Sequence, residues 1–145
     1  IGRLQSNKVK SLCGVVDVWQ SVDRLDLINE IAKRCGEGAT TKMPQIMLQV
    51  NSTNEPGKGG CEPSETENLL RVANSKGLEV LGLMTVGPTE NEPEATRRAF
   101  RLVRKLADDL GIAQCSMGMT GDLEIAVEEG ATAIRVGSAL FGARS

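Results

Sequence analysis

Short apolar segments alternate with longer amphipathic ones along the chain. Segments rich in Val, Ile, Leu and Met are predicted to be β-strands at residues 15–22, 45–51, 78–86, 112–116 and 132–136. Segments with apolar residues at helical spacing are predicted to be helices at residues 6–13, 23–35, 64–76, 93–110, 122–129 and 138–142. The pattern therefore predicts strands and helices that alternate along the whole chain.

Several predicted strands are continuous apolar runs, which is typical of parallel strands buried on both faces. Two architectures fit this pattern: an open doubly wound sheet or part of a (β/α)₈ barrel. A complete barrel needs eight βα units and at least roughly 200 residues. With 145 residues, the five predicted units would form about five-eighths of a barrel. No segment separates as a second domain, so we expect one unit over residues 1–145.

Composition and charge exclude several functions. The chain has 17 Lys and Arg against 19 Asp and Glu, so its charge gives no reason to expect a nucleic-acid partner. It has no His, which excludes His-based zinc sites and Ser-His-Asp triads. No apolar run approaches the roughly 18 residues of a membrane span, and no signal-peptide pattern opens the chain. We expect a cytoplasmic protein with no membrane partner and no metal.

The four cysteines are Cys13, Cys35, Cys61 and Cys115. None forms a C-x-x-C pair, so we expect no structural zinc site. The chain lacks the small size and the cysteine density of secreted disulfide-rich domains, so we predict four free thiols in a reducing compartment. Cys115 is expected in the core, and Cys61 in a glycine-rich loop is expected to be the most exposed.

Two turns that follow predicted strands carry the candidate chemistry. Ser116, Met117 and Gly118 begin the first turn, and Gly137 and Ser138 form the second. Ligands of parallel α/β folds bind beyond the carboxyl ends of the strands, and free N–H groups at helix starts favour anions. Glycine also lets the backbone approach a ligand closely. The pair of turns predicts a phosphate site, with glycines that serve only tight turns as the alternative.

Three further polar residues lie near predicted strand ends. Arg135 could meet a charge or a ring nitrogen of a ligand, and a salt bridge to Asp122 or Glu124 is the alternative. Asn51 ends its strand and could face the same pocket. Lys58, in the glycine-rich loop, is predicted to be solvated rather than catalytic.

Five ordered segments of the chain closely resemble one known family, the pyridoxal 5′-phosphate (PLP) homeostasis proteins. They are IGRLQSNKVK, QVN, GLMTVG, SMGMTGDLEIA and IRVGSALFGAR. The family consists of single-domain, alanine-racemase-like barrels, so the resemblance implies a (β/α)₈ barrel, incomplete here, with strands four to eight. It implies PLP as the cofactor, held by a lysine Schiff base and by two strand-end turns. Carried over to this sequence, the phosphate ligands are Ser116, Met117, Gly118, Gly137 and Ser138. Arg135 is placed near the pyridine nitrogen, and Ser138 stands where many relatives have Thr.

The sequence departs from this family at one point. The family's Schiff-base lysine lies on the first strand, before the segment that matches IGRLQSNKVK, and no lysine of this chain matches it. We therefore expect the C-terminal five-eighths of such a protein, with the phosphate site but without the covalent lysine.

The expected function is PLP binding in intracellular PLP homeostasis, with little or no catalysis. One alternative is a fragment of a PLP-dependent racemase or decarboxylase, although no Tyr is present to act as a catalytic base. A second alternative is a non-covalent phosphate- or nucleotide-binding α/β domain. A monomer is expected for the full-length parent, whereas exposed strand edges make the 145-residue chain prone to aggregation.

Overall fold

The computed structural model describes residues 2–36, 44–90 and 92–142. The strands are β1 (Val18–Val22), β2 (Gln45–Gln49), β3 (Glu79–Met84) and β4 (Gln114–Ser116). The helices are α1 (Val9–Leu12), α2 (Leu25–Gly36), α3 (Thr66–Ser75), α4 (Pro93–Asp109), α5 (Leu123–Glu128) and α6 (Ser138–Phe141), and short 3₁₀ turns η1 (Ser6–Lys8) and η2 (Pro63–Glu65) precede α1 and α3. Each predicted helix and the first four predicted strands are confirmed, with somewhat shorter strands.

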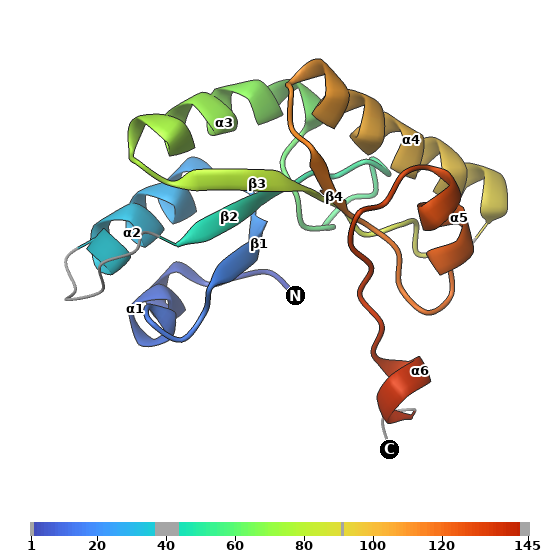
Figure 1. Cartoon of the computed structure of the whole chain (residues 1–145), viewed down its shortest axis with the longest axis horizontal. Helices are drawn as coiled ribbons and strands as arrows, with labels where there is room; N and C mark the ends of the chain where they lie inside the picture. Colours follow the sequence, from blue (N-terminus) through green and yellow to red (C-terminus); the bar gives the residue numbers. More distant parts are fainter. Residues whose placement is uncertain (1, 37–43, 91, 143–145) are drawn as a thin grey trace.

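The four strands form one parallel sheet in the order β1-β2-β3-β4, which is their order in the sequence (Figure 1). A doubly wound sheet reverses its strand order at a switch point, whereas a barrel adds each new strand beside the previous one. The observed order therefore decides between the two architectures predicted from the sequence. The chain has an α/β fold that corresponds to part of a barrel.

The sheet is curved, as a barrel wall must be. In a flat sheet β1 and β4 would lie three strand spacings apart, or roughly 14 Å. The side chain of Ser116 at the end of β4 nevertheless donates a hydrogen bond of 2.7 Å to Gln20 on β1. The two residues are 96 positions apart in the sequence. Their contact across the concave face shows that the two outer strands curl toward each other.

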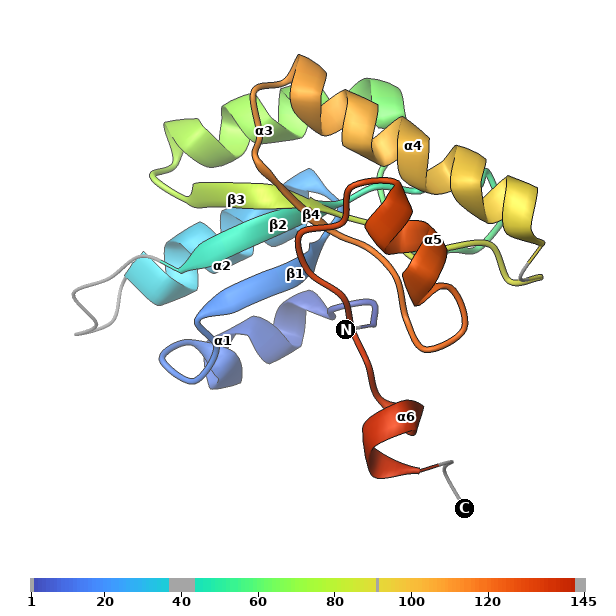
Figure 2. The ribbon, with the colours of Figure 1, turned by 45° about the vertical axis from the view of Figure 1, so that its right-hand side comes forward.

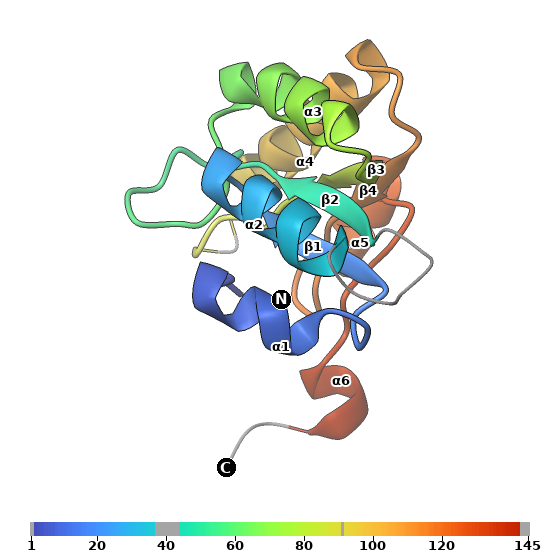
Figure 3. The same cartoon turned by 90° about the vertical axis from the view of Figure 1, so that its left-hand side faces the viewer.

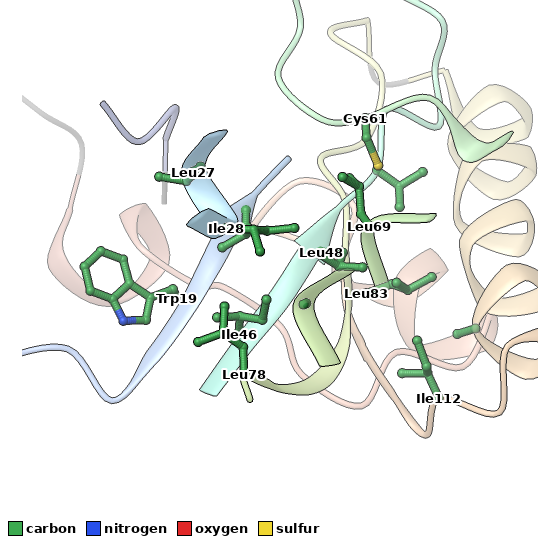
Figure 4. Packing of buried hydrophobic residues seen from close by; sticks show 14 of the residues in the cluster. Trp19, Leu27, Ile28, Ile46, Leu48, Cys61, Leu69, Leu78, Leu83 and Ile112 are labelled. Atoms are coloured by element: carbon green, nitrogen blue, oxygen red, sulfur yellow. The ribbon is translucent and has the colours of Figure 1, made fainter. Parts of the chain in front are cut away.

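The apolar core lies between the other face of the sheet and the helices (Figure 4). Alternation along the strands places Ile46 and Leu48 of β2 in this core, beside Leu83 of β3. The helices contribute apolar stripes to the same cluster, which include Ile28, Ile31, Leu69, Ala73, Phe100 and Val103. Aliphatic side chains dominate the packing, because the sequence has only one Trp, two Phe and no Tyr.

The fifth predicted strand is not formed as a strand. Residues 132–136 are extended beside β4, but they make only an isolated bridge between Ala133 and Ser116. Met117 donates its backbone N–H to Ala133, and Arg135 donates its own to Gly118. A β-strand needs a continuous ladder, and β4 offers only three residues for pairing. The prediction that residues 132–136 form a fifth strand is therefore wrong, although this segment does lie beside β4.

The prediction of four free thiols is also wrong. Cys13 and Cys35 form a disulfide with their Cα atoms 5.3 Å apart. It joins the end of α1 to the last turn of α2, and these two helices pack side by side (Figure 3). The two cysteines are 22 residues apart in the sequence, and that separation does not predict the disulfide, because the pairing depends on how the helices pack.

The two remaining cysteines are free and buried. Cys115 lies in the core as predicted, but the prediction that Cys61 is the most exposed is wrong. Cys61 donates its backbone N–H to Gln49, and its carbonyl accepts a hydrogen bond from Asn51, so the loop runs back along the end of β2. This pairing carries the Cys61 side chain into the core.

Helix α6 projects away from the rest of the chain (Figures 1 and 2). Its apolar side chains Leu140 and Phe141 are 71% and 87% exposed. Within the described ranges, no helix is long and apolar enough to cross a bilayer.

Candidate functional site

Polar residues from four segments meet where the parallel strands end. Gln20 comes from β1, Thr85 directly follows β3, Ser116 ends β4, and Arg135 lies in the extended segment that follows α5. Because the strands are parallel and the sheet is curved, these side chains share the concave face. Hydrogen bonds join all four into one network.

Arg135 is the centre of this network. Its Nη1 donates to Ser116 Oγ at 2.9 Å, and its Nη2 donates to the backbone carbonyl of Thr85 at 2.6 Å. Its Nε is buried and has no hydrogen-bond partner in the part of the chain that the structure describes. Burial lowers the pKa of the Arg135 guanidinium, and the negative charge of Asp122 opposes that shift. Since both direct partners are neutral, the guanidinium keeps a positive charge that a ligand can use.

The hydroxyl of Ser116 is fixed from two sides. It carries one proton, which it donates to Gln20 Oε1, so its lone pairs are left to accept from Arg135. Gln20 thereby sets the direction of the Ser116 hydroxyl and, through it, the position of Arg135. The alternative predicted for Arg135, a salt bridge to Asp122 or Glu124, is not found among the described ion pairs.

A cavity of about 350 Å³ lies beside this network. It is lined by Val18, Gln20, Arg135, Val136 and Gly137. Its volume is within the range of about 300–1,000 Å³ that is usual for small-molecule sites. A side chain added at Gly137 would meet no atom within 4 Å, so open space adjoins this stretch of backbone. The structure thus brings two predicted residues, Arg135 and Gly137, to one cavity.

Met117 and Gly118 have clear structural roles. The Met117 side chain is buried in the core, and its backbone N–H is donated to Ala133. Gly118 has a φ of +94°, and a Cβ there would lie 2.5 Å from Cβ of Ala126 on α5. These two residues seat α5 against the end of β4, as the tight-turn alternative expects. Their assignment as phosphate ligands stays a prediction.

The two predicted turns are joined through hydroxyl groups. Ser138 Oγ, at the start of α6, donates to Thr120 Oγ1 at 3.2 Å. Thr120 lies in the turn between β4 and α5, and both residues are exposed. The pair places two hydroxyls from different segments side by side, which is the arrangement that the predicted phosphate site requires.

Asn51 is occupied within its own loop. Its Oδ1 accepts hydrogen bonds from the backbone and the hydroxyl of Thr53, and its Nδ2 donates to the carbonyl of Glu55. The neighbouring Ser52 is the residue that reaches the network, through a 2.8 Å contact with the Thr85 hydroxyl. The structure therefore does not bring the Asn51 side chain to the cavity, and its role in binding stays a prediction.

Lys58 is not solvated as predicted. Its side chain is only 15% exposed, and Nζ donates to the carbonyl of Gly87 and pairs with Glu55. It joins the loop after β2 to the loop after β3. This contact gives Lys58 a structural role at the rim of the site.

Sequence reasoning missed Gln20 and Thr85. Each is a polar residue in or directly after an apolar run, VVDVWQSV for Gln20 and LEVLGLMTV for Thr85. A polar side chain at such a position indicates a strand face that lines a site. Its partners, however, become visible only once the curvature of the sheet is known.

Comparison with known proteins agrees with this geometry. The family described as the alanine racemase N-terminal domain matches residues 2–145. The chain belongs to this family. It is 42% identical to the pyridoxal phosphate homeostasis protein of Aquifex aeolicus and 40% identical to that of Pseudomonas aeruginosa, over 99% of the chain in both cases. It spans 65% and 63% of the lengths of these two relatives. The resemblance noted from the sequence motifs is thus confirmed.

Solved structures show the same similarity. The structure of PipY from Synechococcus elongatus with PLP bound superposes with a TM-score of 0.85 at 32% identity, and covers 98% of this chain and 68% of PipY. Alanine racemase from Clostridium difficile superposes with a TM-score of 0.73 at 15% identity, over 99% of this chain and 38% of the racemase. At that identity the racemase shows a shared fold alone. The family domain thus carries the barrel-type α/β fold that the strand order indicates.

Proposed function

We propose that this chain binds PLP at the cavity beside Arg135, as part of a protein that serves PLP homeostasis. The observation that carries the proposal is the state of Arg135: a guanidinium held by Ser116 and Thr85 at a cavity, with a buried Nε that has no partner among the described residues. The names of the relatives and the PLP bound to PipY support this choice of ligand.

The residues present fit the two polar ends of PLP. Arg135 offers N–H donors to a ring nitrogen or an anionic group, and Gly137 leaves open space at the cavity wall. The adjacent hydroxyls of Thr120 and Ser138 suit a phosphate group. Ser116 belongs to the proposed binding set as the residue that holds Arg135. Met117, Gly118 and Asn51 stay in it as predicted ligands that do not line this cavity. When bound, PLP itself supplies an electrophilic carbonyl carbon and an electron-withdrawing ring.

We propose a carrier or regulatory role with little catalysis. Proton transfer at a bound ligand needs a positioned acid or base within hydrogen-bond reach. Among the described residues, those that line the cavity (Val18, Gln20, Arg135, Val136 and Gly137) include no carboxylate, thiol or amine. This lining favours binding over racemisation or decarboxylation. The sequential strand order likewise gives no support to an open-sheet nucleotide-binding domain.

The test is binding of PLP to the 145-residue chain, measured by equilibrium dialysis. The Arg135→Ala variant should bind roughly tenfold more weakly or worse, since a hydrogen bond to a charged group contributes about 1.5–3 kcal/mol. The Arg98→Ala variant is the matched control, because Arg98 is exposed on α4 and does not line the cavity. Equal affinity of the Arg135→Ala variant and the unmodified chain would rule out the proposed site.

A cytoplasmic location also remains a proposal. The argument from free thiols no longer supports it, because Cys13 and Cys35 are bonded to each other. Cell fractionation with an antibody against the chain tests the location directly.

A further inference from the structure

Asp122 is a buried carboxylate that the proposed contacts with PLP do not use. Its side chain lies directly before α5, and the residue is only 6% exposed. Burial of a carboxylate is unfavourable unless hydrogen bonds or nearby positive charge compensate for it. The position of Asp122 therefore calls for an explanation.

One part of the explanation is a hydrogen bond within the turn. Asp122 Oδ1 accepts from the backbone N–H of Met119, and the Asp122 N–H donates to the Met119 carbonyl at 3.2 Å. This reciprocal pair closes residues 119–122 into a turn. Thr120, which contacts Ser138, lies inside that turn. Asp122 thus holds one hydroxyl of the proposed phosphate site in place.

The second oxygen faces the loop after β3. A Cβ at Gly87 would lie 2.6 Å from Asp122 Oδ2, so the absence of a side chain at Gly87 makes room for the carboxylate. Oδ2 accepts no hydrogen bond from any residue within the described ranges. Oδ2 is also not one of the fully buried atoms that lack a partner, so the carboxylate keeps contact with solvent beside the turn.

The charge of Asp122 also acts on Arg135. The two residues belong to adjoining segments, because the carbonyl of Gly118, directly before the Asp122 turn, accepts the Arg135 backbone N–H at 2.9 Å. The direct partners of the Arg135 guanidinium are neutral. Burial lowers the pKa of Arg135, and the charge of Asp122 acts in the opposite direction. An anion that approached Arg135 would meet this same negative charge.

We infer that Asp122 has two separable effects on the site: its hydrogen bond holds the turn, and its charge lowers the affinity of the site for anionic ligands such as a phosphate group. The inference rests on the proposed function, in which this site takes the phosphate of PLP. A carrier must release its ligand, and a fixed negative charge in the same turn as Thr120 favours release of an anion held there. Asp122 is thus a positioning residue that also limits the strength of binding.

Two substitutions separate the effects. Asp122→Asn keeps an oxygen that can accept from Met119 but removes the charge, whereas Asp122→Ala removes both. Glu124→Gln is the matched control, because Glu124 is exposed on α5 two residues later and loses the same charge. Inorganic phosphate, PLP and pyridoxal, which lacks the phosphate, are the probes, measured by calorimetry in a phosphate-free buffer.

The Asp122→Asn variant should bind inorganic phosphate and PLP about fivefold more tightly at low ionic strength, with a smaller gain at high salt. Its affinity for pyridoxal should not change, and Glu124→Gln should match the unmodified chain for every probe. Asp122→Ala should bind phosphate more weakly than Asp122→Asn. If Asp122→Ala does not fold, the comparison of Asp122→Asn with Glu124→Gln still decides the matter.

The possible failures can be told apart. Unchanged or weaker phosphate binding by a folded Asp122→Asn variant would overturn the inference, even if the unmodified chain binds PLP. Phosphate binding that Asp122→Asn tightens, in a chain that does not bind PLP, would overturn the proposed function and keep the inference. Binding of neither ligand by the unmodified chain would overturn both.

Discussion

The carboxylate of Glu55, in the loop after β2, accepts hydrogen bonds from both the backbone N–H and the hydroxyl of Thr89, in the loop after β3. Lys58 pairs with the same carboxylate. These contacts lower the pKa of Glu55 from 4.5 to about 2, with the Thr89 hydroxyl as the largest cause. Glu55 therefore links two loops at the rim of the site more strongly when it is ionised than when it is protonated.

This contact predicts a specific loss of stability in acid. Since the pKa of Glu55 is lower in the folded chain, its contribution is complete above pH 4.5 and is lost as the pH falls toward about 2. Denaturant unfolding at several pH values should show a shallower acid dependence for Glu55→Gln than for the unmodified chain. Glu62→Gln, which alters an exposed carboxylate in the same region, serves as the control. An identical acid dependence in the Glu55→Gln variant would contradict this account.

Reduction of the disulfide should destabilise the fold. A cross-link that closes a loop of this size typically contributes about 2–4 kcal/mol. We expect the Cys13→Ser/Cys35→Ser variant to unfold at lower denaturant concentration, and a reductant to shift the unmodified chain but not the variant. Titration of thiols in denaturant without reductant should find two, those of Cys61 and Cys115. A count of four would show that the disulfide does not form.

Gly118 should resist substitution for two separable reasons. Its φ of +94° disfavours any L side chain, and a Cβ would collide with Ala126. Gly118→Ala is expected to cost about 2–4 kcal/mol of unfolding free energy. Gly111→Ala is the control, since Gly111 also has a positive φ but lies in open space, so it should cost only about 1–2 kcal/mol.

A double substitution isolates the collision at Gly118. Adding Ala126→Gly to Gly118→Ala opens the space that the new Cβ needs. The pair should therefore be less destabilised than the sum of the two single variants. Strict additivity would show that backbone strain alone accounts for the cost.

Gln20 on β1 should help to hold the Arg135 side chain in position, through the Ser116 hydroxyl. Gln20→Ala removes the acceptor for the Ser116 hydroxyl proton. The hydroxyl can then rotate its proton toward Arg135, which weakens the hydrogen bond between Arg135 and Ser116. We expect a loss of about 1 kcal/mol in stability and weaker PLP binding. Gln45→Ala, which removes a hydrogen bond from a half-buried glutamine to Glu79, should leave PLP binding unchanged. Normal PLP binding by Gln20→Ala would show that Arg135 does not depend on this network.

The exposed apolar residues of α6 predict self-association. Leu140 and Phe141 are largely in solvent, and β1 pairs on one side only within the described sheet. Such surfaces favour contacts between copies. The unmodified chain should elute from a sizing column as concentration-dependent oligomers, and Leu140→Ser/Phe141→Ser should shift it toward the monomer. A monomer at every concentration would contradict the prediction.

The sequence predicted what local pattern controls and missed what tertiary contact controls. Helix α4 and strand β2 follow directly from apolar spacing, so their predicted positions agree with the structure. The segment at 132–136 reads as a strand, but a strand requires a partner with enough residues to pair.

The same limit applies to the site and to the cysteines. Arg135 near the end of the predicted strand 132–136 and Gly137 directly after it are predicted site residues, and both line the cavity. Gln20 reaches the site only because the sheet curves. The Cys13–Cys35 bond likewise depends on how α1 packs against α2.

The bonds that hold Arg135 have a thermodynamic consequence. A long side chain that is free in solution loses rotamer entropy when a ligand fixes it, and that loss weakens binding. Here the fold itself has already fixed the guanidinium, through Ser116 and the carbonyl of Thr85. A ligand at this cavity therefore meets a preorganised donor, and little of its interaction energy is spent on ordering the side chain that receives it.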